Sequence, residues 1–237
     1  MALRALVFLR STSSARQQRL INGFFSPIGR EAKGLEAQRE RFLIPGATTV
    51  GLVCDEGVIL AAEKRVSYGY YVMSRAGKKV FKITDRIGAA CAGLVADMQI
   101  LVREVGAYAK LYEYEVGRPM SVRAAAKLMS NILFNQRLFP LLTQTIVGGM
   151  DDEGPVLYVL DPLGSLVPDK YAAVGSGAEI ALGVLEADYK DGLSVSDGRE
   201  LALKAVKSAI SRDAISGDGV DLLIITPKGP VEESIRF

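Results

Sequence analysis

Residues 47–65 read ATTVGLVCDEGVILAAEKR, and this stretch has the pattern of a β-hairpin. Two runs rich in small and β-branched residues, Ala47–Cys54 and Gly57–Arg65, lie on either side of the turn Asp55-Glu56-Gly57. Such runs, joined by a short turn that contains glycine, are typical of two antiparallel strands. The folded part of the chain is therefore predicted to begin with antiparallel sheet.

Further along the chain, the apolar period changes from that of strands to that of helices. A second strand pair is predicted at 79–83 and 87–92. Over residues 94–112, apolar side chains recur at spacings of 4, 3, 4, 3 and 4. This stripe predicts a long helix that ends before Gly117, and Ser121 is a candidate N-cap for a second helix.

The second half of the chain repeats this order of elements. Strands are predicted at 143–147, 156–160, 171–174 and 220–226, and helices at about 178–187 and 194–212. Ser194 and Asp197 have the spacing of a capping box at the start of the last helix. The succession predicts an α+β fold in four layers, an α-β-β-α sandwich of two stacked antiparallel sheets between helix pairs.

The composition excludes several kinds of chemistry. The 237 residues, 49% hydrophobic and 24% charged, suit one globular domain, and no run approaches the length of a membrane span. Because the chain contains no histidine, a Ser/His/Asp or Cys/His site cannot form within it, nor can a histidine-based zinc or iron site. Hydrolysis would need a lysine, a carboxylate, a metal on oxygen ligands or a free α-amine as its base. Cys54 and Cys91 lie in apolar runs and are expected to be buried thiols in a reducing interior.

The first 46 residues differ in charge from the rest of the chain. They contain eight basic and three acidic residues, a net charge of +5, whereas residues 47–237 carry −3. We expect residues 1–46 to be a propeptide or basic leader, although their arginine-rich composition is also that of a mitochondrial targeting peptide. The acidic body does not favour nucleic-acid binding.

The run PGATTVG at 45–51 resembles the start of a mature proteasome β subunit, in which glycine precedes a run such as Thr-Thr-Thr-Val-Gly. The resemblance covers nearly all of residues 46–237 and is closer to archaeal than to bacterial subunits. Its landmarks, in order, are AAEKR at 61–65, GKK at 77–79, AGLVAD at 92–97, VGG at 147–149, GSG at 175–177 and SRDAISG at 211–217. Proteasome β subunits are N-terminal nucleophile hydrolases, so the resemblance implies that class.

The resemblance implies a mechanism that needs no histidine. In this family autocatalytic cleavage removes the propeptide, the new N-terminal threonine attacks the substrate carbonyl, and the α-amine takes the proton. An α-amine has an ordinary pKa of about 8, which suits a base near neutral pH. No cofactor or metal is implied.

The resemblance also assigns site residues. Lys79 would make the nucleophilic hydroxyl easier to deprotonate, Glu63 would keep that lysine charged, and Arg65 belongs to the same cluster. The backbone N–H of Gly93 would be the oxyanion donor. The α-amine would be oriented by Ser176, Asp213 and Ser216, and the substrate pocket would be lined by Val66, Gly77, Phe81, Cys91, Val95 and Gln99.

The nucleophile position is occupied by Ala47. In the family the glutamate, the lysine and the oxyanion glycine follow the nucleophile by sixteen, thirty-two and forty-six residues, and here all three spacings lead to residue 47. Alanine has no hydroxyl, so it can neither attack a peptide bond nor release the propeptide. A natural alanine and an alanine substituted for threonine would give the same inactive subunit. Thr48 is the alternative nucleophile, but successive side chains on a strand point to opposite faces.

Three hypotheses follow. The first is a structural β subunit in a hetero-oligomer of stacked seven-membered rings, flanked by α subunits, whose active β subunits cleave unfolded polypeptides. The second is a threonine endopeptidase that uses Thr48 after removal of residues 1–47, and the third is another hydrolase of the superfamily, such as an amidase. The expected location is the cytoplasm. Tyr108, Tyr112 and Tyr114 are expected either at a subunit interface or over the domain's own core.

Overall fold

The computed structural model describes residues 46–69 and 71–237. The leader predicted for residues 1–46 therefore lies, apart from Gly46, outside the described residues. No helix in the described part is long and apolar enough to cross a membrane.

The first sheet contains the predicted hairpin at its centre. Its strand order is β10-β1-β2-β11-β12, and all neighbouring strands are antiparallel. The strands are β1 (Thr48–Cys54), β2 (Gly57–Glu63), β10 (Tyr171–Gly175), β11 (Val220–Thr226) and β12 (Gly229–Ile235). Strand β12 was not predicted from the sequence, because it contains Pro230 and an exposed Glu232; both are tolerated on an edge strand.

The second sheet has the order β5-β6-β7-β8-β9 and is also antiparallel. Its strands are β5 (Val80–Lys82), β6 (Ile87–Gly93), β7 (Thr143–Asp151), β8 (Gly154–Leu160) and β9 (Val167–Asp169). Strand β7 continues past its predicted end through Gly148 and Gly149. A Cβ on Gly149 would collide with the Arg86 carbonyl, so glycine is what lets the two backbones approach here.

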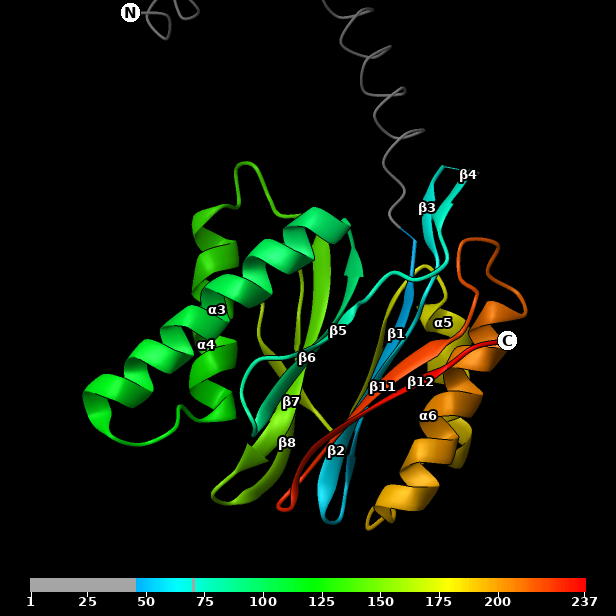
Figure 1. The fold of residues 1–237 in the computed structure, drawn as a ribbon. Helices are drawn as coiled ribbons and strands as arrows, with labels where there is room; N and C mark the ends of the chain where they lie inside the picture. Colours follow the sequence, from blue (N-terminus) through cyan, green and yellow to red (C-terminus); the bar gives the residue numbers. More distant parts are fainter. Residues whose placement is uncertain (1–45, 70) are drawn as a thin grey trace, which may run out of the picture. The chain divides into compact units, whose positions relative to one another are not determined.

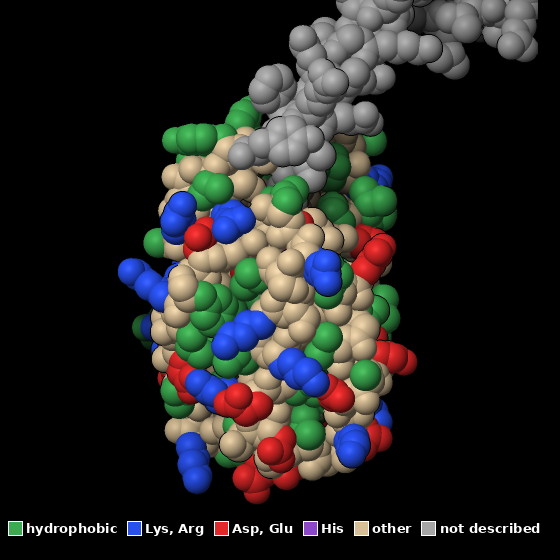
Figure 2. Space-filling model, turned by 90° about the vertical axis from the view of Figure 1, so that its right-hand side faces the viewer, with side chains coloured by type: hydrophobic (Ala, Val, Ile, Leu, Met, Phe, Trp, Pro, Cys, Tyr) green, Lys and Arg blue, Asp and Glu red, His purple; other side chains and the backbone are tan. Residues whose placement is uncertain are grey.

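Two pairs of helices cover the outer faces of the sheets (Figure 1). Helices α3 (Val95–Val116) and α4 (Val122–Asn135) pack on the second sheet, and α5 (Ala178–Asp188) and α6 (Val195–Ile210) pack on the first. The predicted caps are confirmed, since the hydroxyls of Ser121 and Ser194 accept hydrogen bonds from Ala124 N and Asp197 N, both at 3.1 Å. The face covered by α5 and α6 carries lysine, arginine and acidic side chains interspersed with small apolar patches (Figure 2).

Three apolar clusters separate the four layers. One lies between the first sheet and α5/α6, one between the second sheet and α3/α4, and the third between the two sheets. Glycine allows the sheets to pack closely, since a Cβ on Gly51 would lie 2.7 Å from the side chains of Ile146 and Leu157. The predicted α-β-β-α sandwich is confirmed.

A third, small sheet belongs to neither large one. Strands β3 (Val66–Tyr68) and β4 (Tyr71–Ser74) pair only with each other among the described residues. The register shifts between Val66 and Ser67, which is a bulge or irregularity. The sequence did not predict this hairpin, because its strands are too short to show a clear period.

Candidate active site

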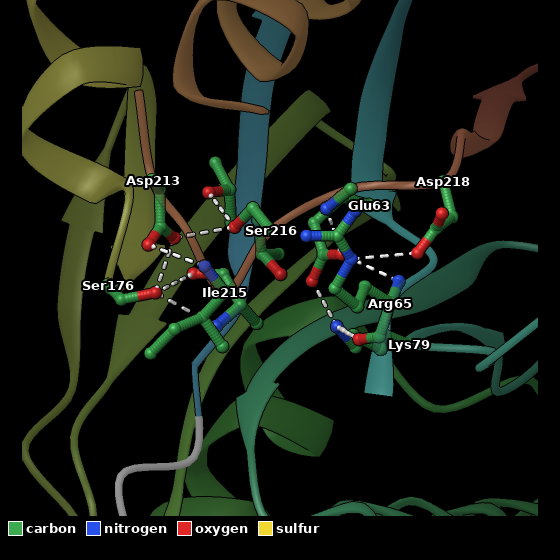
Figure 3. Close-up of polar contacts among 12 residues, drawn as sticks. Glu63, Arg65, Lys79, Ser176, Asp213, Ile215, Ser216 and Asp218 are labelled. Carbon is green, nitrogen blue, oxygen red and sulfur yellow. Dashed lines mark hydrogen bonds and ion pairs between the residues drawn. The ribbon is translucent and has the colours of Figure 1, made fainter. Parts of the chain in front are cut away.

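The site lies where strand β1 begins and strand β2 ends. The segment between α6 and β11, residues 211–219, passes beside both strand ends and carries two of the predicted site residues, Asp213 and Ser216. The polar side chains beside these strand ends form two clusters (Figure 3). We call Glu63, Arg65 and Lys79 the lysine cluster, and Thr48, Ser176, Asp213 and Ser216 the serine cluster.

The lysine cluster is a buried ion pair supported by backbone groups. Lys79 Nζ donates to Glu63 Oε1 and, at 2.5 Å, to the carbonyl oxygen of Arg65. The other carboxylate oxygen, Glu63 Oε2, accepts from Arg65 N at 2.7 Å and from Gly217 N at 3.0 Å. Lys79 and Glu63 are each only 1% exposed. The pairing of Glu63 with Lys79 that the resemblance implied is thus present in the structure.

Burial and attraction act in opposite directions on this pair. Burial lowers the pKa of Lys79 and raises that of Glu63, because each charged form is deprived of water. The mutual attraction and hydrogen bond oppose both shifts, and the two N–H donors to Oε2 further favour the carboxylate. The proton of Lys79 is therefore held less firmly than that of an exposed lysine.

The side chain of Arg65 joins the lysine cluster to the 211–219 segment. Its Nε lies 2.8 Å from Asp218 Oδ2, and its Nη1 lies 3.1 Å from the Ala214 carbonyl oxygen. The guanidinium lies against Gly217, where a Cβ would collide with it. The hydrogen bond from Arg65 lowers the pKa of Asp218. Sequence reasoning missed Asp218, although it follows directly after the 211–217 landmark.

The serine cluster holds the backbone of residue 47. Ala47 N donates to Ser176 Oγ at 3.2 Å, and Ser176 Oγ donates to Asp213 Oδ2 at 2.6 Å. Ser216 Oγ donates to the same carboxylate oxygen, also at 2.6 Å. Of the three residues expected to surround the nitrogen of the nucleophile residue, Ser176 bonds it directly, and Asp213 and Ser216 are joined to Ser176 through the Asp213 carboxylate. In a chain that began at residue 47, this nitrogen would be the α-amine.

Thr48 belongs to this cluster through its side chain. Its hydroxyl lies 2.7 Å from Ser216 Oγ and is fully buried. Since Ser216 gives its proton to Asp213, the Thr48 hydroxyl is the donor to Ser216. A Cβ on Gly177 would collide with the Thr48 hydroxyl and touch Ala209 of α6, so this side chain faces the helix layer.

Ala47 faces the other way. Its side chain is fully buried in the apolar cluster between the two sheets, which also contains Val80 and Ala92. Thr49 points in the same direction and bonds the Cys91 carbonyl oxygen of the second sheet at 3.0 Å. Residues 47 and 48 thus follow the alternation that the sequence predicted.

Gly93 and the six predicted pocket residues have varied surroundings. Gly93 ends β6 with φ 137°, and the Leu142 carbonyl leaves no room for a Cβ, so the fold requires glycine there. Gly77 lies directly against Val66, and Phe81 and Val95 are half-buried, whereas Gln99 is exposed on α3. Cys91 is fully buried, and burial raises the pKa of its thiol to about 12.

The other cysteine is also buried, as predicted, and burial raises the pKa of Cys54 to about 12. Within residues 46–69 and 71–237, no group of three or more acidic or cysteine side chains is placed to hold a metal ion.

The fold has two stacked antiparallel sheets between helix pairs, and the residue just before strand β1 is held by its nitrogen near a buried lysine. These features define the N-terminal nucleophile hydrolase class. A family model described as "Proteasome subunit" matches residues 45–225.

Curated proteins agree with the family model. The chain is 51% identical over 192 residues to "Proteasome subunit beta 2" of Pyrobaculum calidifontis, an alignment that covers 81% of this chain and 95% of that relative. It is also 51% identical over 189 residues to "Proteasome subunit beta 1" of Nitrosopumilus maritimus, covering 80% and 95%. The chain belongs to the proteasome subunit family and is a β-type member of it.

Proposed function

We propose that this chain is a structural β subunit of the proteasome core particle and does not itself cleave peptide bonds. The observation that carries the proposal is the combination of an alanine at residue 47 with intact lysine and serine clusters around it. A covalent mechanism without an attacking group loses most of its rate, whatever else the site retains.

The retained groups define what a hydroxyl at residue 47 would meet. An ammonium has three N–H donors, and the described residues supply acceptors for two of those of Lys79, namely Glu63 and the Arg65 carbonyl. The third donor would serve the hydroxyl of a threonine at this position. The nitrogen of residue 47 already has Ser176 as a partner. The side chain at residue 47 is therefore the component that the site lacks.

The alternative nucleophile, Thr48, has less support. Its hydroxyl donates to Ser216 in the serine cluster, is fully buried and faces α6. To act on a peptide bond it would have to leave that hydrogen bond and turn toward the other face of β1. This placement favours the structural role over an endopeptidase that uses Thr48.

In the proposed role, residues 47–237 form the folded domain, and residues 1–46 are a leader that this subunit cannot cut by its own chemistry. The domain would assemble with α subunits and other β subunits in stacked seven-membered rings in the cytoplasm, where active β subunits would cleave unfolded polypeptides. Tyr108 and Tyr114 of α3 are 47% and 79% exposed, which favours an interface there over the domain's own core.

The test restores the missing hydroxyl. In full-length protein assembled with its partner subunits, Ala47→Thr should produce self-cleavage after Gly46 and hydrolysis of fluorogenic peptides at least about 10³-fold above the parent. Ala47→Val is the matched control, because valine has the shape of threonine without the hydroxyl, and it should do neither. Both variants are checked for assembly by sedimentation.

Two results would contradict the proposal. One is appreciable peptidase activity of the parent chain that disappears in Thr48→Ala, together with a new N-terminus at Thr48 by mass spectrometry. The other is an Ala47→Thr variant that assembles, yet neither cleaves itself nor reacts with a threonine-directed inhibitor. In that case the two clusters would not form a working site.

A further inference from the structure

A cavity of about 300 Å³ lies at the end of the sandwich away from the candidate active site. It is formed by the end of β1, the start of β8, strand β9 and the turn between α5 and α6. Ala47 precedes the first residue of β1, whereas the cavity lies beside its last residues, at the lower end of the view in Figure 1. A volume of this size is at the lower limit for sites that bind small molecules.

The cavity exists because both sheets lack an edge strand at this end. Strand β10 pairs with β1 only as far as Leu52, and β9 pairs with β8 only from Leu157 onward. A space therefore remains between the two sheets. Pro155 and Pro168 line this space and have no N–H group, so an added peptide strand could not pair fully there. The cavity is suited to a small ligand and not to a further strand.

Aromatic and aliphatic side chains form much of the cavity wall. The ring of Tyr189 is fixed from two sides, since its hydroxyl donates to the Val53 carbonyl oxygen at 3.0 Å and its centroid lies 4.6 Å from that of Tyr171. Tyr158 and Val156, both half-buried on β8, also line the cavity. Such a wall suits an alkyl chain, and tyrosine rings in addition attract cations.

The charged groups of the lining are mostly acidic. In the described part of the chain they are Asp55, Asp169, Asp191 and Lys170. Lys170 Nζ donates to both carboxylate oxygens of Asp191, at 2.8 and 2.7 Å, so these two charges offset each other. Asp55 and Asp169 form no ion pair with any described residue, and each accepts from the backbone N–H that follows it. Two carboxylates beside the cavity are therefore without a cation.

Two titratable groups in the lining respond to this negative charge. Burial, and after it the charge of Asp55, raises the pKa of the Cys54 thiol to about 12. Burial, and after it the charge of Asp191, raises the pKa of the Tyr189 hydroxyl. The acidic groups thus disfavour a further negative charge in the cavity and favour a positive one.

We propose that this cavity binds a linear alkyl amine with two or more positive charges, a ligand of the polyamine class. The alkyl chain lies against Val156 and the rings of Tyr158 and Tyr189, and the ammonium groups donate to Asp55 and Asp169. Because the cavity is separate from residue 47, this inference goes beyond the proposed function and does not depend on it.

The test is calorimetric titration of the assembled protein with spermidine. Binding should saturate at one ligand per copy of this chain and should weaken as the salt concentration rises. A linear diol of the same chain length is the matched neutral ligand, and it should bind at least about tenfold more weakly because it cannot form charge-assisted hydrogen bonds. Since the ligand contacts both sheets, spermidine should also raise the midpoint of thermal unfolding.

Two double variants separate the cavity from the rest of the acidic surface. Asp55→Asn combined with Asp169→Asn should weaken spermidine binding about tenfold or more, because both carboxylate partners are removed. Glu113→Gln combined with Glu115→Gln removes the same charge from exposed positions on α3, outside the cavity, and should leave binding nearly unchanged. Tyr158→Leu, which removes one ring, should weaken binding about threefold or more.

Four outcomes would overturn the inference. They are the absence of saturable binding, equally tight binding of the diol, an equal loss in the α3 double variant, and binding that the Asp55/Asp169 double variant leaves intact. The third would show a general effect of the acidic surface, and the fourth would place the ligand elsewhere. The proposed function is unaffected by all four, because its test lies in the chemistry of residue 47.

Discussion

The lysine cluster and the serine cluster lie beside the same residue but are built differently. The lysine cluster is a fully buried ion pair in which Glu63 receives Lys79 and two backbone N–H groups. The serine cluster is a chain of hydroxyl groups that converge on one carboxylate, Asp213. The first depends on charges removed from water, and the second depends on neutral donors directed at a single acceptor.

The two clusters share one feature that explains how an alanine can be accommodated. Neither uses the side chain of residue 47, because the serine cluster binds its backbone nitrogen and Lys79 is held by Glu63 and Arg65. Loss of a hydroxyl there removes an attacking group, while Lys79 keeps its acceptors Glu63 and the Arg65 carbonyl. A site of this design can lose its chemistry and keep its structure.

The largest expected effect on stability is at Lys79. Lys79→Met leaves the Glu63 carboxylate buried without its counter-ion and should lower the free energy of unfolding by about 3–5 kcal/mol at pH 7. Burial raises the pKa of Glu63 above its ordinary value of 4.5, so the penalty should shrink as the pH falls toward that value and the carboxyl becomes neutral. Urea unfolding at pH 5 and pH 7 measures both effects.

The control for this variant is Lys79→Met combined with Glu63→Gln. The double variant carries no buried charge and should regain much of the stability. A loss in the single variant that does not depend on pH, or no recovery in the double variant, would mean that packing and not charge dominates the lysine cluster.

A smaller effect is expected in the serine cluster. Thr48→Val keeps the shape of the side chain and removes the hydrogen bond to Ser216, which should cost about 1–2 kcal/mol. Thr48→Ser keeps the hydroxyl and serves as the control. Chemical unfolding should show that the loss is smaller than for Lys79→Met and is constant between pH 5 and pH 8. A loss as large as that at Lys79 would remove the distinction between the clusters.

The smallest effect is expected at Asp218, the partner of Arg65. Asp218→Asn keeps an acceptor and suits the left-handed backbone there (φ 68°), so it should cost about 1 kcal/mol at pH 7. The hydrogen bond from Arg65 lowers the pKa of Asp218 below 3.8 in the folded state. Its contribution is present above that pH and is lost as the pH falls further.

Thermal or urea unfolding between pH 7 and pH 2 would check this prediction. The stability of the parent and the Asn variant should converge at the acid end. Curves that stay parallel down to pH 2 would show that the charge of Asp218 does not stabilise this segment.

The regular parts of the fold were predictable because their apolar residues recur with a clear period. The hairpin at 47–65, the helix that starts near residue 94 and the caps Ser121 and Ser194 are where the sequence placed them. Strands β3, β4, β9 and β12 were missed, because each is short or lies at an edge and buries too little to show a period.

The candidate site likewise has features that could be predicted from the sequence and contacts that could not. The spacing of Glu63, Lys79 and Gly93 led to residue 47, and strand alternation placed Thr48 on the opposite face from Ala47. The contacts of Asp218 were not predictable, since nothing in local sequence shows that the segment after α6 returns to the end of β2. Contacts between segments about 150 residues apart are decided by how the layers pack.

The sequence by itself determined the order of the elements, the alternating faces of β1 and the absence of a hydroxyl at residue 47, because these depend on local period and on residue identity. Only the tertiary structure decided that Thr48 donates to Ser216 and that the nitrogen of Ala47 is held by Ser176. These features arise when buried polar groups find partners and when sheets order their strands, and both depend on residues far apart in the chain.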